Sequence, residues 1–145
     1  MKVHTTNYIN TFIEVAEDCP EEMGVIPPRK GHRKTAASVQ YEMISENPYI
    51  FSSDDVVFKI FAMRNKIPKA DWEAEQASFF SKVQPCFRAS LLCRQYGFGV
   101  HSDAEGKLAL FGRETDGYAA LMTNQQIRKV KAMRFKKGFG NKNIA

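Results

Sequence analysis

Residues 96–112 of the chain read YGFGVHSDAEGKLALFG. Two runs with apolar and β-branched side chains, 96–102 and 107–112, flank a short polar loop at 103–106. The loop ends in Gly106, which tolerates the positive φ that tight turns between strands require. This stretch therefore predicts an antiparallel hairpin in the C-terminal half of the chain.

Three helical stretches are predicted upstream of the hairpin, at 35–44, 53–63 and 71–80. The second has the strongest local signals, because a serine at its start can cap the helix and two aspartates occupy the first turn. Pro48 ends the first stretch, since the residue before a proline avoids the helical region of backbone space. Most of the chain between residues 35 and 80 is therefore expected to be helical.

The remaining segments complete the fold prediction. Residues 8–16 are rich in β-branched and aromatic side chains and predict a strand, whereas the prolines and glycines of 21–33 predict a surface loop. Residues 116–122 predict a short helix, and 127–135 fits the helical and the strand period equally poorly. Strands and helices do not alternate regularly along the chain, so we predict an α+β fold. Its small antiparallel sheet contains the hairpin, and its helices pack on one face.

The length and composition fit one globular domain. A chain of 145 residues with 43% hydrophobic residues can bury a core of its own. No apolar run approaches the roughly 20 residues that a bilayer span needs, and residues 1–7 lack the apolar core of a signal peptide. The three cysteines cannot all pair with one another and are interpreted as reduced thiols. We therefore expect a cytoplasmic protein, monomeric or homodimeric, that has no membrane partner.

The net charge of +5 is unevenly distributed along the chain. Residues 128–145 contain seven basic and no acidic side chains, so residues 1–127 carry a net charge of −2. We therefore predict a single globular domain over 1–127, followed by a basic C-terminal segment with a flexible end. Such a segment attracts phosphate groups, which predicts weak, non-specific nucleic-acid binding through 128–145.

The segment 84–101, QPCFRASLLCRQYGFGVH, concentrates reactive side chains. It places a thiol, a guanidinium, a hydroxyl and an imidazole close together in the sequence, among glycines that allow close backbone approach. The catalytic candidates are Cys86 and His101. The ligand-binding candidates are Arg88, Ser90, Tyr96, His101, Asn47 and Tyr49.

Three functions fit these residues. We favour a binding module for a small anionic molecule or an acidic partner segment, because the candidates are rich in donors but include no evident acid–base pair. A cysteine-dependent enzyme would use Cys86 as nucleophile, His101 as base and Arg88 as the anion-binding group. In the purely structural alternative, Cys86 is a core residue and the edge of the hairpin pairs with another chain.

No metal site is predicted. The possible metal ligands are scattered along the chain, and no pair of them has the spacing of a zinc finger or of a helical site. These residues are His4, Cys19, His32, Cys86, Cys93 and His101. Because no phosphate-binding loop or other cofactor motif occurs either, we expect no cofactor.

The order of short motifs along the chain resembles a family of small bacterial proteins that is known only as a domain of unknown function. The motifs are Thr6-Asn7-Tyr8, Thr11-Phe12-Ile13, Asp18-Cys19-Pro20, Glu46-Asn47-Pro48-Tyr49, Ser53-Asp54-Asp55-Val56, Phe79-Phe80-Ser81-Lys82, Gln84-Pro85-Cys86, Arg88-Ala89-Ser90, Tyr96-Gly97, Gly99, His101 and Glu105-Gly106-Lys107. The resemblance extends to about residue 135. It implies a cytoplasmic bacterial single-domain protein and assigns no activity.

The chain departs from that family at one point. Members often contain a proline after the Arg-Ala-Ser motif, which favours an extended backbone at that point. Leu91, Leu92 and Cys93 follow the motif here, so the sequence gives less support for an extended backbone through these residues. The hairpin and the helix after it also resemble, more loosely, the small α+β proteins related to MmcQ and YjbR. That resemblance implies a link to DNA binding at the level of the fold alone.

Overall fold

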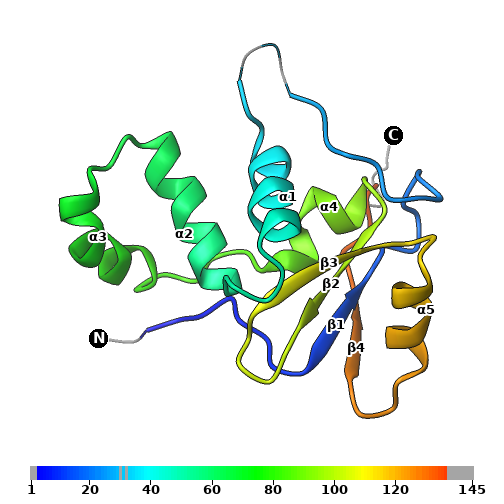
Figure 1. Ribbon diagram of the computed structural model, residues 1–145. Helices are drawn as coiled ribbons and strands as arrows, with labels where there is room; N and C mark the ends of the chain where they lie inside the picture. The colour runs from blue at the N-terminus through cyan, green and yellow to red at the C-terminus, as the bar shows by residue number, and fades with distance from the viewer. Residues whose placement is uncertain (1–2, 30, 32, 137–145) are drawn as a thin grey trace.

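The computed structural model describes residues 3–29, 31 and 33–136, and over this range the chain forms one sheet with helices around it (Figure 1). The strands are β1 (Thr11–Glu14), β2 (Phe98–Ser102), β3 (Leu108–Gly112) and β4 (Arg128–Lys131). The helices are α1 (Ala36–Glu46), α2 (Ser53–Arg64), α3 (Trp72–Phe79), α4 (Leu91–Arg94) and α5 (Asp116–Thr123), with 3₁₀ turns at Lys69–Asp71 and Phe87–Ala89. The predicted α+β class is confirmed.

The sheet has the strand order β3-β2-β1-β4. The predicted hairpin is confirmed, since β2 and β3 pair antiparallel over their full lengths. The expectation of a purely antiparallel sheet is wrong, because β4 pairs parallel with β1. The reason is the connection through α5. A helix between two strands carries the chain back to its starting end, so β4 runs in the same direction as β3 and therefore as β1.

Strand β4 lies in the segment whose period was ambiguous in the sequence. Backbone N–H groups of Arg128 and Ala132 donate to the carbonyls of Asn10 and Glu14, which extends the pairing beyond both ends of the strand. The first four residues of the predicted basic segment thus belong to the sheet. The predicted flexible end of that segment, at 137–145, lies outside the described residues.

Helices cover both faces of the sheet, so the expectation that they share one face is wrong. The main core lies under α1, α2 and α4, where Ile13, Val100 and Leu108 are buried. On the other face lies α5 (Figure 1). Its Tyr118 packs edge-on against the ring of Phe12, with ring centroids 4.9 Å apart. Gly99 makes this possible, because a side chain at that position would occupy the space of both rings.

A second, smaller hydrophobic cluster joins α2 to α3. Phe58, Ala62 and Phe80 are buried there, and Trp72 packs edge-on against Phe58 at 5.5 Å between centroids. The indole nitrogen of Trp72 donates to the backbone carbonyl of Ile67, 3.0 Å away. The two helices therefore form a lobe that has its own apolar interior beside the sheet.

The N-terminal segment is attached to the start of α2 by a polar cluster. One carboxylate oxygen of Asp54 accepts the Thr6 backbone N–H and hydroxyl, both at 2.7 Å, and the other accepts the Thr5 hydroxyl at 2.6 Å. In return, the side-chain oxygen of Asn7 accepts the backbone N–H of Asp54 at 2.9 Å. Because this N–H belongs to the first turn of α2, the contact also satisfies a group that has no partner within the helix.

The outer edge of the hairpin is occupied over part of its length. The backbone N–H of Tyr49 donates to the carbonyl of Leu108, whose own N–H donates to the carbonyl of Phe51. An isolated bridge between Ser52 and Lys107 continues this pairing. The edge that we considered for pairing with another chain is therefore covered at these residues.

The polar cluster predicts that Asp54 contributes strongly to stability. Replacing Asp54 with alanine removes three hydrogen bonds and leaves the backbone N–H of the buried Thr6 without an acceptor, although the Thr6 hydroxyl keeps its contact with the Ser53 hydroxyl. We expect the free energy of unfolding to fall by about 2–4 kcal/mol, because hydrogen bonds to charged groups are the stronger ones. Asp55→Ala is the matched control, since it loses one bond to the Ser52 N–H and should cost about 1 kcal/mol. Equal losses in urea denaturation would contradict this role.

The packing of α5 predicts a large effect at Gly99. In Gly99→Ala the added methyl group would overlap the Phe12 ring and lie 2.8 Å from Tyr118, so stability should fall by about 1–3 kcal/mol through overpacking. Gly112→Ala in the neighbouring strand is the control, because there the methyl group meets the movable carboxylate of Glu114. Thermal unfolding of both variants checks this, and a loss at Gly112 equal to that at Gly99 would refute the account.

Candidate functional site

The segment 84–101 folds into a 3₁₀ turn, helix α4 and strand β2, and the short helix was not anticipated from the sequence. Ser90 starts α4, because its hydroxyl oxygen accepts the Leu92 backbone N–H at 3.1 Å. The same hydroxyl donates to the side-chain oxygen of Gln40 in α1, 2.6 Å away. Ser90 thus caps α4 and attaches it to α1.

The two cysteines of the segment have different surroundings. Cys86 is half-buried, and its Sγ lies 3.3 Å from the hydroxyl of Tyr8. Burial and the hydrogen bond to Cys86 both raise the pKa of Tyr8, so this hydroxyl keeps its proton at neutral pH. Cys93 is fully buried in the main core, and burial strongly raises the pKa of its thiol. Cys93 is therefore a core residue, whereas Cys86 lines a surface hollow.

His101 and Tyr49, two of the predicted ligand-binding residues, lie together. The Tyr49 hydroxyl is 2.8 Å from Nδ1 of His101, and the two rings meet edge-on. Burial lowers the pKa of His101 and outweighs the opposing charge of Asp103, so the neutral imidazole is favoured. Burial also raises the pKa of Tyr49. At neutral pH the pair is therefore an uncharged hydrogen bond between Tyr49 and His101.

Cys86 and His101 lie on opposite sides of the sheet. His101 pairs with Phe12 across the strands and packs against Phe111, on the face that α5 covers. Cys86 lines a hollow whose other walls come from α1, α2 and Ser90. Because successive strand residues alternate between faces, His101 points away from the core that its neighbour Val100 enters. The arrangement gives Cys86 no histidine partner within the described residues.

The other predicted residues are spread over three places. Nε of Arg88 donates to the last carbonyl of β4 at 2.7 Å. The carbonyl of Tyr96 accepts the backbone N–H of Val25 at 2.8 Å, which holds the loop before α1 on the sheet. The side-chain amide of Asn47 donates a hydrogen bond to a carbonyl in the last turn of α1 at 3.0 Å and caps the end of that helix. The six ligand-binding candidates therefore do not share one pocket.

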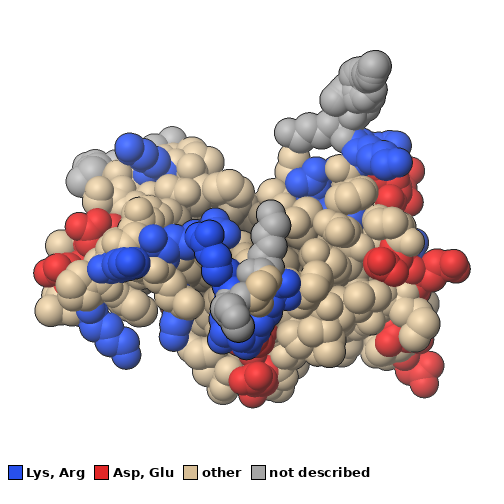
Figure 2. All heavy atoms as spheres, turned by 90° about the horizontal axis from the view of Figure 1, so that it is seen from above, with Lys and Arg blue, Asp and Glu red and all other residues tan. Residues whose placement is uncertain are grey.

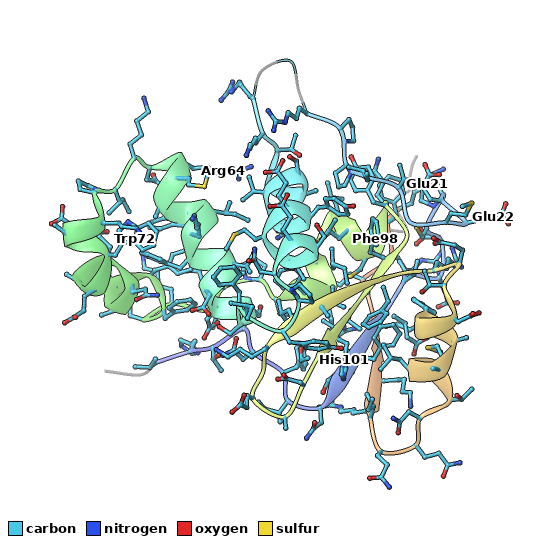
Figure 3. The ribbon with its side chains drawn as sticks, viewed as in Figure 1. Glu21, Glu22, Arg64, Trp72, Phe98 and His101 are labelled. Carbon is cyan, nitrogen blue, oxygen red and sulfur yellow. The ribbon has the colours of Figure 1, made fainter. Side chains whose placement is uncertain are left out.

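A cavity that the sequence analysis did not identify opens between the start of α1 and the end of α2. Its volume is about 310 Å³. The lining consists of a basic group, Arg33, Lys34 and Arg64, together with Thr35, Ala36, Val39, Ile60 and Met63. Figure 3 shows Arg64 between the C-terminal end of α2 and α1, well away from His101. The cavity thus combines a cationic rim with an apolar floor.

A second hollow of about 170 Å³ adjoins this cavity. The two share Ala36 and Ile60 as lining residues. Cys86 and Ser90 contribute to the wall of the second hollow, so two of the sequence candidates lie next to the cavity. We refer to the larger space as the α1–α2 cavity and to the smaller one as the adjoining hollow.

The basic residues at the α1–α2 cavity differ in their partners. Lys34 donates to Glu42 at 2.7 Å, and Arg29 lies 3.4 Å from the same carboxylate. The hydrogen bond from Lys34 is the main cause of the lowered pKa of Glu42. Over the described part of the chain, Arg33 and Arg64 form no ion pair. Lys and Arg side chains gather over the middle of the face seen in Figure 2.

Sequence reasoning missed the cavity because its residues come from two separate segments. Arg33 and Lys34 precede the first turn of α1, and Arg64 ends α2. A basic residue in the last turn of a helix usually serves the helix itself, since it balances the dipole. Only the packing of α1 against α2 shows that Arg33 and Arg64 line the same cavity.

Among the described residues, no group of three or more His, Cys, Asp and Glu side chains is arranged to hold a metal ion. None of the helices formed by these residues is long and apolar enough to cross a membrane.

Comparison with other proteins relates the chain to a family. A search of curated proteins and a search of solved structures each found no match. A family model matches residues 3–138, a range that includes every strand and helix described above. The predicted resemblance to a family of unknown function is thereby confirmed. The chain belongs to the family of unknown function DUF6157.

Proposed function

We propose that this protein is a small binding module that holds an amphipathic anion in the α1–α2 cavity. One observation carries the proposal, namely the combination of three basic residues with an apolar floor in a single space of about 310 Å³. Ligand sites in proteins are typically concave and mostly apolar, with a few polar groups that fix the orientation of the ligand. A carboxylate, sulfonate or phosphate at the rim and a hydrocarbon body on the floor would match this pattern.

The charges at the rim favour an anion. Arg33 and Arg64 have no carboxylate partner among the described residues, and an arginine presents paired donors that fit a planar or tetrahedral anion. The first turn of α1 contains no acidic side chain, so nothing there neutralises the positive end of the helix dipole. Lys34 is already paired with Glu42 and contributes less. The anionic group is therefore expected between Arg33 and Arg64.

The apolar part of the ligand has two places to bind. Val39, Ile60 and Met63 form the floor of the cavity, and Met63 is 47% exposed. Beyond the shared residue Ala36, the adjoining hollow adds Val57 and further apolar groups. Covering this surface would remove apolar area from water, which favours binding at about 25 cal/mol per Å².

The cysteine-dependent alternative has less support. A nucleophilic thiol needs a base within hydrogen-bonding reach, and the group next to Cys86 is the hydroxyl of Tyr8. His101 is hydrogen-bonded to Tyr49 on the other side of the sheet. A binding role for the adjoining hollow requires neither a base nor an activated thiol.

The proposal can be tested with two probes that differ only in charge. 8-Anilinonaphthalene-1-sulfonate carries a sulfonate, and N-phenyl-1-naphthylamine has the same apolar body without it. We expect the anionic probe to bind more tightly, and Arg33→Gln or Arg64→Gln to weaken its binding about fivefold, as expected for an exposed ion pair worth up to about 1 kcal/mol. Binding of the neutral probe should not change. Fluorescence titration measures both dissociation constants.

Lys69→Gln provides the control, because it removes one positive charge from an exposed position that lines no part of the cavity. Equal affinities for the two probes would contradict the anion site. An equal loss of sulfonate binding in Lys69→Gln would show that the net charge of the protein, rather than the cavity, attracts the probe.

A further inference from the structure

Basic side chains from two separate parts of the chain meet along β4 and the residues that follow it. Arg88 comes from the 3₁₀ turn and Arg94 from α4, and both reach the segment 131–136. We call this set the basic edge; it comprises Arg88, Arg94, Arg128, Lys131, Arg134 and Lys136. Arg88, a predicted ligand-binding residue, thus lies on this edge rather than in a pocket.

Backbone contacts fix the two arginines that join the edge from outside the C-terminal segment. Nε of Arg88 donates to the carbonyl of Lys131 at 2.7 Å, and the Arg88 carbonyl accepts the N–H of Met133 at 2.8 Å. Nε and Nη2 of Arg94 donate to the carbonyl of Arg134 at 3.1 and 2.8 Å. Over the described chain, both terminal nitrogens of Arg88 and Nη1 of Arg94 have no acceptor. These donors are therefore held in place and available to a ligand.

A carboxylate fixes the far end of the basic edge to the domain. The side chain of Asp18 accepts the backbone N–H groups of Phe135 and Lys136 at 2.7 and 2.9 Å. Although partial desolvation opposes the shift, these N–H groups lower the pKa of Asp18, so it is ionised at neutral pH. The described part of the basic segment is thus built into the fold.

The basic edge is long and narrow. Eight residue steps separate Arg128 from Lys136, and an extended chain of that length spans at most about 28 Å. A nucleic-acid strand advances about 3.4 Å per nucleotide along a duplex, so the edge corresponds to at most about eight nucleotides. The exposed apolar residues beside it are Leu91 and Met133, 40% and 41% exposed, which is little apolar area for binding to a membrane surface.

We propose that the basic edge binds the phosphate backbone of nucleic acid without reading base sequence. The contacts are electrostatic and are made by guanidinium and ammonium groups to phosphate oxygens. Arg88 and Arg94 contribute because their backbone contacts hold them beside the strand at fixed positions. This surface is separate from the α1–α2 cavity, so the proposal does not depend on the proposed small-molecule function.

The test uses the full chain and a fluorescein-labelled oligothymidylate of about 20 nucleotides. Fluorescence anisotropy gives the affinity between about 50 and 200 mM salt, and four phosphate contacts to a single strand would weaken binding about 50-fold over that range. The double variant R88Q/R94Q should bind more weakly and should reduce the slope of log affinity against log salt by about 1.4, corresponding to two lost contacts. A duplex of the same length is measured in parallel.

Two double variants with the same change of charge serve as controls. K66Q/K69Q lies on the connection between α2 and α3 and should leave the salt slope unchanged. K137Q/K142Q tests the end of the chain. The proposal is overturned if neither nucleic acid binds at 50 mM salt, if all three variants weaken binding equally, or if K137Q/K142Q abolishes binding that R88Q/R94Q retains. Binding to phosphatidylserine vesicles but to neither nucleic acid would overturn it as well.

A further variant keeps the test decisive if R88Q/R94Q loses its cooperative melting transition. Arg128 and Arg134 donate no side-chain hydrogen bond within the described residues, so R128Q/R134Q removes two charges of the basic edge without breaking a hydrogen bond, although Asp18 loses the favourable charge of Arg134. The same reduction of the salt slope, by about 1.4, supports the proposal. An unchanged slope in this folded variant refutes it.

Discussion

The architecture depends on one short strand. β1 has only four residues, yet it pairs with β2 on one side and with β4 on the other. Its side chains also serve both layers, because Ile13 enters the main core and Phe12 supports α5. Without β1, strand pairing would no longer join the hairpin to β4, and α5 would lose the Phe12 ring on which Tyr118 packs. The polar cluster around Asp54 secures the residues that lead directly into this strand.

The features that could be predicted from the sequence are those that depend on neighbouring residues. The serine before α2 forms the expected cap with Asp55, and Gly106 has the positive φ that the hairpin loop requires. The features that could not be predicted depend on contacts between distant parts of the chain. Val130 and its neighbours match neither the helical nor the strand pattern, because three of the four residues of this edge strand are charged and the strand is defined only by its pairing with β1. Likewise, the need for a glycine at position 99 follows only from the fold, because Tyr118 occupies the space that a side chain there would fill.

The candidate site illustrates the same limit. The closeness of Cys86 and His101 in the sequence predicts that they act together. In the fold, α4 and the first residues of β2 lie between them, and the alternation of side chains along β2 directs His101 to the other side of the sheet. The α1–α2 cavity has the opposite property, since Arg33 and Arg64 are distant in sequence and meet through helix packing. The residue types alone indicate which reactive and charged groups the chain contains. The topology determines which of these groups share a space.

The pairing of β1 also has a consequence for synthesis of the protein. Thr11 pairs with Ser102 and Arg128, so the last partner of this strand is made 117 residues after it. At the usual rate of about 5–20 residues per second, β1 waits roughly 6–23 s after its own synthesis before the sheet can close. Asp54 is available much earlier, and its bonds to Thr5 and Thr6 hold the segment ahead of β1 against α2. The N-terminal cluster is therefore suited to retain the nascent strand next to a helix until the C-terminal half of the chain has left the ribosome.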